Sequence, residues 1–434
     1  MLSKSDNELI CRVGSDTPMG KAFRHYWLPV MLSSELPEAD GRPFPVEVCG
    51  ERIVVFRDSN GTIGALDEFC RHRGASLLLG RVENCGIRCI YHGWKFAVDG
   101  TILETPNVNE SHFKDRFKAR SYPIQDVGGL VWIYLGDPAS APPLPNWAFM
   151  KVPERNRLPV VAIVNCNYVQ LMEGVVDSSH LSILHTVGLK ATDAVDLDFA
   201  RKTNHMQFDA APILEAEETD FGFHYVALRH NDRGAEPVTE ARVAAYVSPC
   251  FVLNPNGDIF FSFTPINDER VLFIHVWWDA EKPYGEEPLR SQQLSFVGLD
   301  QETLAEFGMT RETSAMPERA RRENNFMQDR DAMARGHFTG LPGFVQEDAA
   351  VSMSGGTIRN RSKEMLSHAD VAIIRLYRSL LKSAKLVANG EEPVAVHSDV
   401  SKIAGACGIL KPDEEWRDLV PDHRPVKKQD ALVR

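Results

Sequence analysis

The stretch that decides the fold of this chain is CRHRGASLLLGRVENCGIRCIYHGW, residues 70–94. It carries a Cys-x-His pair at Cys70 and His72 and, after 16 intervening residues, a Cys-x-x-His pair at Cys89 and His92. Two cysteines and two histidines fit either zinc or a two-iron cluster with mixed ligands. Zinc sites usually join their cysteines in one short motif and place both histidines later in the chain. Here each half supplies one of each, which favours a [2Fe–2S] cluster with both thiolates on one iron and both imidazoles on the other.

The residues around the two halves agree with a metal site. Gly74 and Gly93 follow the halves and permit the tight backbone turns that such loops need. The chain has eight cysteines, too few for a disulfide scaffold, yet three of them fall between residues 70 and 89. In a reducing compartment this grouping indicates metal before disulfide. The third of them, Cys85, is interpreted as an ordinary loop or core cysteine.

Length and charge exclude several classes of protein. A chain of 434 residues is longer than one ordinary core supports, so two or three domains are expected. The net charge of −12 argues against a nucleic-acid binder, which needs a basic surface to neutralise phosphates. No stretch reaches the roughly 20 apolar residues that span a bilayer, so no membrane segment is expected. The opening MLSKSDNE lacks the apolar core of a signal peptide, and the cytoplasm is the expected location.

A cluster of prolines marks the expected boundary between two domains. Four of them fall within eight residues, at Pro138, Pro142, Pro143 and Pro145. Before them, residues 43–66 and 94–103 contain short β-branched or aromatic runs separated by turn signals, and residues 130–135 predict a buried strand. We therefore predict one domain over residues 1–150, including an N-terminal segment, and a second over residues 151–434.

Both types of secondary structure are expected in the second domain. Residues 205–280 alternate in strand fashion, residues 165–187 have helical spacing, and a helix is predicted from about 367 to 389 with Gly390 as its C-cap. A long antiparallel sheet flanked by helices is an α+β arrangement.

A second group of candidate ligands lies in EGVVDSSHLSILH, residues 173–185. On a helix of about 100° per residue, Asp177 and His180 share a face, whereas His185 is rotated away from them. Both imidazoles can meet one ion only if the helix widens into a π-bulge or ends between them. Taken alone, such histidines are usually satisfied surface or core residues, and Asp177 can be an ordinary helix-face carboxylate.

Together the two motifs resemble the Rieske non-haem iron oxygenases. The first looks like the Rieske motif of ring-hydroxylating enzymes, and Asp177-x-x-His180-x4-His185 looks like the segment whose two histidines bind mononuclear iron. The resemblance implies an all-β Rieske [2Fe–2S] domain followed by a helix-grip catalytic domain with an antiparallel sheet. It also implies one cluster and one mononuclear non-haem Fe(II) per subunit. A structural zinc ribbon is the alternative for the first motif.

The resemblance extends to a third iron ligand and to Asp177. In Gln346-Glu347-Asp348, the Gln-Asp-x-Ala pattern of the phthalate dioxygenase branch places the ligand role on Asp348, which completes a 2-His-1-carboxylate triad. Glu347 stands where that branch usually has glutamine, which leaves open which acid binds iron. The counterpart of Asp177 is not a ligand in the family. It hydrogen-bonds to the iron-binding histidine and, across a subunit interface, to a Rieske histidine, which is His92 here.

Similarity to the phthalate dioxygenase-type branch implies partners and a reaction. Members are homo-oligomers, trimers or stacked trimers, and take electrons from a separate NADH-dependent reductase that carries FMN and [2Fe–2S]. This chain has no glycine-rich dinucleotide fingerprint, which agrees with NADH oxidation elsewhere. The implied function is a terminal oxygenase that cis-dihydroxylates a phthalate-, phenoxybenzoate- or substituted benzoate-like acid with O2. The alternative is a Rieske O-demethylase of a methoxylated aromatic acid. A Rieske electron carrier is remote, because a carrier needs only about a hundred residues.

Two residues are candidates for holding the aromatic acid. Arg242 matches a position that binds a substrate carboxylate in the phthalate enzymes, and its guanidinium offers a bidentate fork. A second arginine that the family uses is missing, and His205 falls near that place. The competing interpretation of Arg242 is a surface strand residue.

Overall fold

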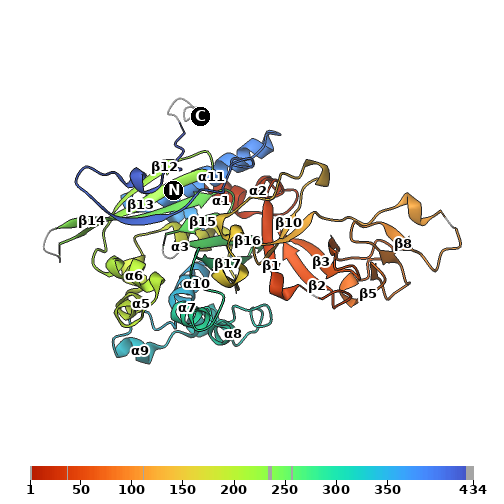
Figure 1. Cartoon of the computed structure of the whole chain (residues 1–434), viewed down its shortest axis with the longest axis horizontal. Helices are drawn as coiled ribbons and strands as arrows, with labels where there is room; N and C mark the ends of the chain where they lie inside the picture. Colours follow the sequence, from red (N-terminus) through yellow and green to blue (C-terminus); the bar gives the residue numbers. More distant parts are fainter. Residues whose placement is uncertain (1, 37, 111, 233–236, 256–257, 427–434) are drawn as a thin grey trace.

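Short β-branched runs on both sides of the two Cys/His pairs form three small antiparallel sheets. The computed structural model describes residues 2–36, 38–110, 112–232, 237–255 and 258–426, without the side chain of His205. The strands of this part are β1 (Trp27–Leu32), β2 (Phe44–Val48), β3 (Glu51–Arg57), β4 (Ile63–Asp67), β5 (Arg81–Val82), β6 (Ile87–Arg88), β7 (Lys95–Phe96), β8 (Ile102–Glu104), β9 (Ile124–Val127) and β10 (Leu130–Tyr134). They pair as β1-β10-β9, β2-β3-β4 and β5-β6-β7-β8. Figure 1 shows these strands at one end of the molecule, and the all-β N-terminal part is confirmed.

An eight-stranded antiparallel sheet forms the centre of the second part. Its strands are β11 (Arg157–Val164), β12 (Ile213–Glu218), β13 (Gly222–Asn231), β14 (Val238–Val247), β15 (Phe251–Asn254), β16 (Ile259–Asn267), β17 (Arg270–Trp278) and β18 (Ala406–Leu410). The order is β11-β17-β16-β15-β14-β13-β12, with β18 on β14. Because β12 to β17 follow one another along the chain, they form a meander of hairpins. The expected α+β architecture is confirmed, and the boundary predicted near residue 150 stays a prediction between β10 and β11.

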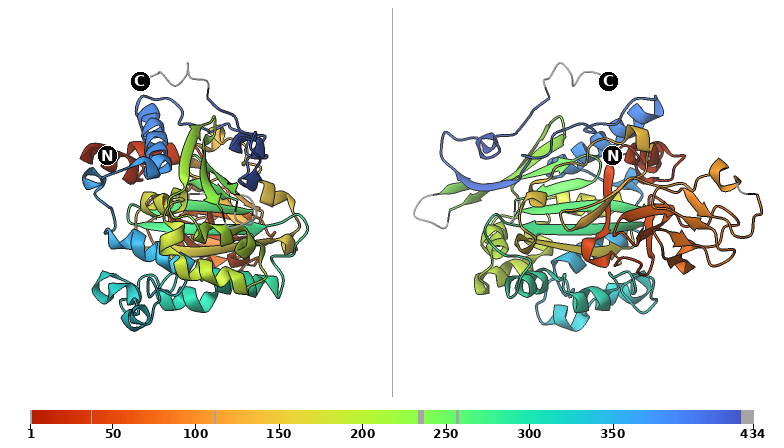
Figure 2. Two further views of the ribbon diagram at one scale, coloured as in Figure 1. Left: turned by 90° about the vertical axis from the view of Figure 1, so that its left-hand side faces the viewer. Right: turned by 45° about the vertical axis from the view of Figure 1, so that its right-hand side comes forward.

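Helices cover this sheet on two sides. The helices are α1 (Lys4–Cys11), α2 (Pro18–Phe23), α3 (Tyr168–Val176), α4 (Leu181–Leu184), α5 (Thr186–Ala191), α6 (Asp198–Thr203), α7 (Leu289–Val297), α8 (Gln301–Phe307), α9 (Arg330–Ala334), α10 (Phe344–Ser354) and α11 (Val371–Ala388). In Figures 1 and 2, α11 lies above the sheet together with α1, and α7 to α10 gather below it. Every helix in the described ranges is too short or too polar to cross a lipid bilayer.

The N-terminal helices pack on the second part of the molecule. Tyr168 of α3 donates its hydroxyl hydrogen to the carbonyl of Ile10 at 2.8 Å. Asn7 of α1 accepts from Arg361 at 2.9 Å, and the guanidinium of Arg361 in turn contacts Glu173 of α3. Arg361 is fully buried and the side chain of Glu173 is 5% exposed, so this is a buried ion pair. It fixes the N-terminal segment to the helix that leads into the candidate iron motif.

Breaking that ion pair is expected to destabilise the protein. In an Arg361→Met variant, Glu173 stays buried without its main counter-charge, which costs about 3–5 kcal/mol. Arg359→Met is a matched control, because Arg359 lies 3.5 Å from the same carboxylate but is 33% exposed, and such a pair contributes about 1 kcal/mol or less. Urea unfolding followed by circular dichroism measures both. Equal losses in the two variants would show that burial of the Arg361 pair is not the cause.

Candidate metal centres and active-site cavity

Two loops of the same shape present the cysteines and histidines of residues 70–94. In each loop the backbone N–H of the cysteine donates to the carbonyl five residues later, at 2.8 Å in both cases. Gly74 and Gly93 donate back to the carbonyls of Cys70 and Cys89 at 2.9 and 3.0 Å. Both glycines have left-handed backbone conformations, with φ of 72° and 75°, which other residues adopt only with strain. The two halves of the motif therefore fold as a matched pair, as their spacing predicted.

The four side chains fit a [2Fe–2S] cluster. Cys70 and Cys89 are buried and both are free thiols. Burial and the neighbouring Cys89 thiol raise the pKa of Cys70 to about 11. The imidazoles of His72 and His92 lie with their centres 4.6 Å apart. Nδ1 of His92 is buried and has no hydrogen-bond partner among the described residues, which is expected of a nitrogen that ligates iron.

The backbone of the second motif is interrupted and does not form one continuous helix. α3 ends at Val176, and Asp177 follows in an extended conformation as its C-cap. His180 and His185 flank the single turn of α4. This break, and not a π-bulge, turns the two imidazoles toward each other, with their Nε2 atoms 3.3 Å apart. Asp177 therefore does not share a helix face with His180, although its Oδ2 still lies 3.7 Å from Nδ1 of His180.

Asp348 of α10 completes a three-residue group. Its Oδ1 lies 3.5 Å from Nε2 of His180 and 3.3 Å from Nε2 of His185, and the three ligand atoms all fall within 4.8 Å of one another. Burial alone would raise the pKa of Asp348, but the two histidines hold it below its usual range. Burial lowers the pKa of His180, but Asp177 and Asp348 overcome this and raise it to about 10. Two imidazoles and one carboxylate facing a common point fit a non-haem iron site.

Glu347 has a different position from Asp348. Its Oε2 lies 2.7 Å from Nδ1 of His185, the ring nitrogen that faces away from the triad. Its Oε1 accepts from the hydroxyl of Thr339 at 2.5 Å. A carboxylate on the outer nitrogen fixes the tautomer and orientation of a metal-binding histidine. Asp348 therefore faces the two Nε2 atoms, whereas Glu347 faces the outer nitrogen of His185. The sequence alone did not distinguish these two positions.

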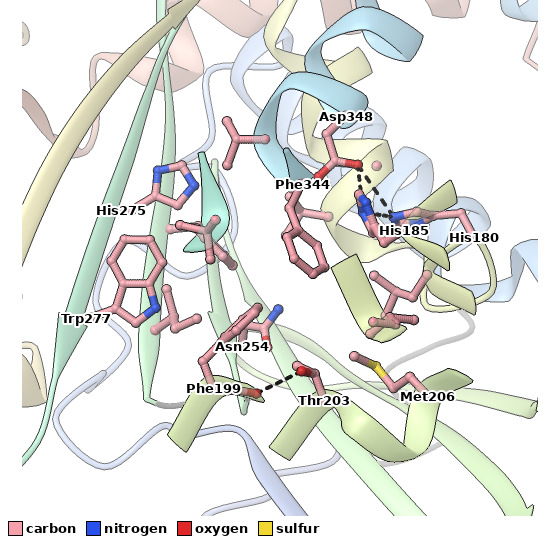
Figure 3. A pocket seen from close by; sticks show the side chains of 18 of the residues that line it. His180, His185, Phe199, Thr203, Met206, Asn254, His275, Trp277, Phe344 and Asp348 are labelled. Atoms are coloured by element: carbon pink, nitrogen blue, oxygen red, sulfur yellow. Dashed lines mark hydrogen bonds and ion pairs between the residues drawn. The ribbon is translucent and has the colours of Figure 1, made fainter. Parts of the chain in front are cut away.

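A cavity opens beside the triad, as Figure 3 shows. Aromatic and aliphatic side chains make most of its wall, among them Leu189, Phe199, Ile259, Phe261, Phe273 and Phe344. Few side chains with polar atoms besides the triad reach it, namely Thr203, Arg242, Asn254, His275 and Trp277. Such a pocket buries a flat apolar ring and orients it through a few polar contacts.

Arg242 lies in the wall of this cavity. It is 2% exposed, which excludes the interpretation as a surface strand residue. Its Nη1 donates to Oγ of Ser178 at 3.1 Å, and Arg229 of the neighbouring strand donates to the Ser178 carbonyl at 2.8 Å. The two arginines therefore also hold the turn that follows Asp177. His205, the other predicted substrate residue, has a side chain outside the described part of the chain.

Sequence reasoning missed several residues of the site. Ser178, Thr339 and His275 belong to no motif, and only the folded chain brings them to the triad or the cavity. Alternation along residues 270–278 gives a weak signal for His275, because it places this residue on the same face as Phe273 and Trp277.

Models of two protein families match the chain. The family described as Rieske [2Fe-2S] domain matches residues 26–123, and the family described as LigXa C-terminal domain like matches residues 133–432. The second match covers more than half of the chain.

Curated relatives match along nearly the whole length. The phthalate 4,5-dioxygenase oxygenase subunit of Pseudomonas putida is 34% identical, over 96% of this chain and 94% of its own. The 3-chlorobenzoate-3,4-dioxygenase oxygenase subunit of Comamonas testosteroni is 34% identical over 91% and 92%. The 5,5'-dehydrodivanillate O-demethylase oxygenase subunit of Sphingobium sp. (strain NBRC 103272 / SYK-6) is 28% identical over 92% and 84%.

The fold also matches solved structures. The crystal structure of dicamba monooxygenase bound to 3,6-dichlorosalicylic acid superposes with a TM-score of 0.54 at 20% identity, over 84% of this chain and 98% of that one. At this identity the similarity concerns the fold alone.

Proposed function

Because this chain belongs to the Rieske non-haem iron oxygenases, we propose that it is the terminal oxygenase component that hydroxylates an aromatic carboxylic acid. It is an oxidoreductase with one Rieske [2Fe–2S] cluster and one mononuclear non-haem iron per subunit. The proposed reaction is cis-dihydroxylation of a phthalate-, phenoxybenzoate- or substituted benzoate-like ring with O2 and reductase-supplied electrons. The observation that carries the proposal is an aromatic-walled cavity with the His/Asp triad at one side and a buried arginine in its wall.

Seven side chains are proposed to hold the two metal groups, and one further carboxylate orients a ligand. We propose that Cys70, His72, Cys89 and His92 hold the cluster and that His180, His185 and Asp348 hold the mononuclear iron. When bound, these groups store an electron and activate O2. Glu347 accepts a hydrogen bond from the Nδ1–H of His185. This tautomer leaves Nε2 of His185 without a proton and directed toward His180 and Asp348.

Asp177 is proposed as a positioning residue. Its Oδ1 accepts from the backbone N–H of Ser179 at 2.7 Å, which fixes the turn, while its Oδ2 faces Nδ1 of His180. That nitrogen is buried and has no hydrogen-bond partner in the described chain, so a small shift of the turn suffices to form the bond. The predicted hydrogen bond of Asp177 to His92 of a second subunit stays a prediction.

The cavity wall selects for a flat acid. Phe199, Phe344 and their neighbours bury the ring and exclude water from the triad. Arg242 brings a buried guanidinium into this wall. It can donate a charge-assisted hydrogen bond to a substrate carboxylate.

Removing the guanidinium is expected to weaken binding of the acid. Loss of a charged hydrogen bond in Arg242→Ala raises the KM for an aromatic acid by about ten- to a hundredfold, and affects its uncharged methyl ester far less. Ser178→Ala is the control, because it removes the bond between Ser178 and Arg242 without touching the substrate. Steady-state oxygen uptake measures both variants. If Ser178→Ala raises the KM equally, Arg242 acts through the turn and not on the carboxylate.

O-demethylation of a methoxylated aromatic acid is the second candidate function. It is favoured by the match to the dehydrodivanillate O-demethylase subunit over 92% of this chain. The two reactions need the same triad and differ in which carbon of the bound acid faces it. Products separate them, since dihydroxylation yields a cis-diol, whereas demethylation yields formaldehyde and a phenol.

A substrate screen tests the proposed function. The holoenzyme with a reductase is given benzoate, the phthalate isomers, phenoxybenzoates and methoxybenzoates, and oxygen uptake and products are followed. At least one acid is expected to stimulate oxygen uptake and to give a hydroxylated or demethylated product. Stimulation by none of these acids, with cluster and iron both present, would contradict the proposal.

Partners follow from the same proposal. We infer that electrons come from an NADH-dependent reductase with FMN and [2Fe–2S], and that the oxygenase is a cytoplasmic homotrimer or stacked trimer. Ile90 and Tyr91, next to the cluster loops, expose 59% and 54% of their surface. Exposed apolar side chains beside a redox centre support a surface that another subunit or protein covers.

A further inference from the structure

One wall of the cavity carries polar atoms that the protein leaves unsatisfied. His275 and Trp277 lie two residues apart on β17, both 2% exposed, and both line the cavity. Nδ1 of His275 and Nε1 of Trp277 are buried and have no hydrogen-bond partner among the residues described. Figure 3 shows the two rings on the strand side of the cavity, across from Asp348 and the two iron-site histidines.

Packing holds the imidazole of His275 in place. Its ring centre lies 3.9 Å from that of Phe273 and 4.9 Å from that of Phe261, and it stacks on Trp277 at an interplanar angle of 10°. These three aromatic contacts fix the orientation of the ring. A buried polar group without a partner is costly, and its presence in a fixed position calls for a ligand that supplies one.

The hydrogen bonds that this wall offers are uncharged. Burial lowers the pKa of His275 to about 3, against the opposing charge of Asp348, so the imidazole is neutral near pH 7. The indole of Trp277 is only a donor, and a neutral imidazole has one donor and one acceptor nitrogen. Neither compensates a carboxylate, which needs a positive partner when buried. In this cavity Arg242 provides that charge.

The two polar positions suit the two ends of one ring. Arg242 is on β14 and His275 on β17, with β15 and β16 between them. The register places His275 in line with Tyr246 of β14, four residues from Arg242. Three strand spacings of about 4.8 Å and four residues of about 3.3 Å put the two backbones roughly 20 Å apart. An arginine side chain, a substituted benzoate and an imidazole together span such a distance.

We propose that His275 and Trp277 form a second polar subsite that binds an uncharged oxygen substituent on the ring of the aromatic acid. The substituent is a hydroxyl, methoxy or carbonyl oxygen. The inference rests on the proposed function, because it assumes a carboxylate held by Arg242. It assigns the substrate to oxygen-substituted aromatic monocarboxylic acids, in preference to dicarboxylic or alkyl-substituted ones. By fixing the far end of the ring, the subsite sets which carbon faces the triad.

Binding of matched ligands tests the subsite without turnover. Dissociation constants of ortho-, meta- and para-methoxybenzoate and of the corresponding ethylbenzoates are measured by calorimetry on the holoenzyme without reductase. The two members of each pair have the same number of heavy atoms and differ in one oxygen. The wild type is expected to prefer one methoxy isomer by about tenfold, the value of one net hydrogen bond. His275→Phe keeps the aromatic stacking and is expected to bind both members of that pair equally.

Two further variants make the outcome decisive. Trp277→Phe removes the indole N–H together with part of the ring but keeps an aromatic side chain, and it tests the subsite independently if His275→Phe does not fold. Met206→Leu changes another part of the cavity wall, away from His275 and Trp277 in Figure 3, so it is expected to keep the methoxy preference. The inference is overturned if the wild type shows no preference, or if the preference survives in both His275→Phe and Trp277→Phe. If no aromatic acid binds to the wild type at all, the proposed function fails first and the subsite with it.

Discussion

An Asp348→Ala variant is expected to lose the mononuclear iron and more than about 99% of product formation, while the Rieske cluster stays intact. Among the residues that the structure describes, Asp348 is the one carboxylate that faces both Nε2 atoms of His180 and His185, at 3.5 and 3.3 Å. Loss of a residue that hydrogen-bonds to a metal ligand costs about 10–100-fold in metal affinity or activity, and loss of the ligand itself costs more. Iron is expected to fall from about three to about two atoms per chain. Iron analysis, the visible spectrum and oxygen uptake measure the three effects.

Glu347→Gln is the matched control next to it in the chain. The amide keeps the size of the side chain but weakens the contact with Nδ1 of His185 and the bond from Thr339. We expect roughly a 10–100-fold loss of iron affinity or activity, with iron restored when it is added in excess. The reverse pattern, with Glu347→Gln stripped of iron and Asp348→Ala still loaded, would exchange the two roles.

A Cys89→Ser variant is expected to lose the cluster, and with it all oxygenase activity. Cys89 is 2% exposed and is presented by a loop that matches the one at Cys70. Serine is a poor ligand for the iron of a cluster that is held by soft thiolates. The visible absorption and the Rieske EPR signal on reduction are both expected to disappear, and iron is expected to fall by about two atoms per chain.

Cys85→Ser provides the control for this second experiment. Cys85 lies four residues earlier in the same motif, but it is exposed, and its sulfur accepts a hydrogen bond from Asn60 at 3.2 Å. We expect the spectrum and the activity of this variant to equal those of the wild type. A bleached Cys85→Ser protein, or a coloured Cys89→Ser protein, would show that the ligand assignment is wrong.

The sequence predicted the parts of the molecule that are determined locally. The spacing of Cys70, His72, Cys89 and His92 requires two similar loops, and the glycine after each half permits their left-handed turns. The strands around these loops and the helix at Val371–Ala388 follow from periodicity, because each buries one face. The α+β class then follows from the order of the elements.

The sequence did not predict what depends on contacts between distant residues. Helical spacing continues through residues 165–187, yet α3 ends at Val176. Arg229 and Arg242 bind Ser178 from two strands of the sheet, and their bonds hold the turn after the helix. Similarly, Glu347 and Asp348 are adjacent acids that the sequence alone does not distinguish. Only the direction of α10 decides which of them faces His180 and His185. Local propensity contains no information on such partners.

The docking of the first helices has a consequence for engineering. Asn7 and Ile10 bond to residues beyond position 160, whereas the strands of the Rieske part run from residue 27 to residue 134. In three dimensions the electron-storing module is thus an insert within the oxygen-activating one, although in the chain it comes first. A chimaera that borrows this module from a relative should exchange residues 27–134 and keep the native first 24. Splicing at the proline-rich stretch alone would replace the anchor of α3 along with the cluster.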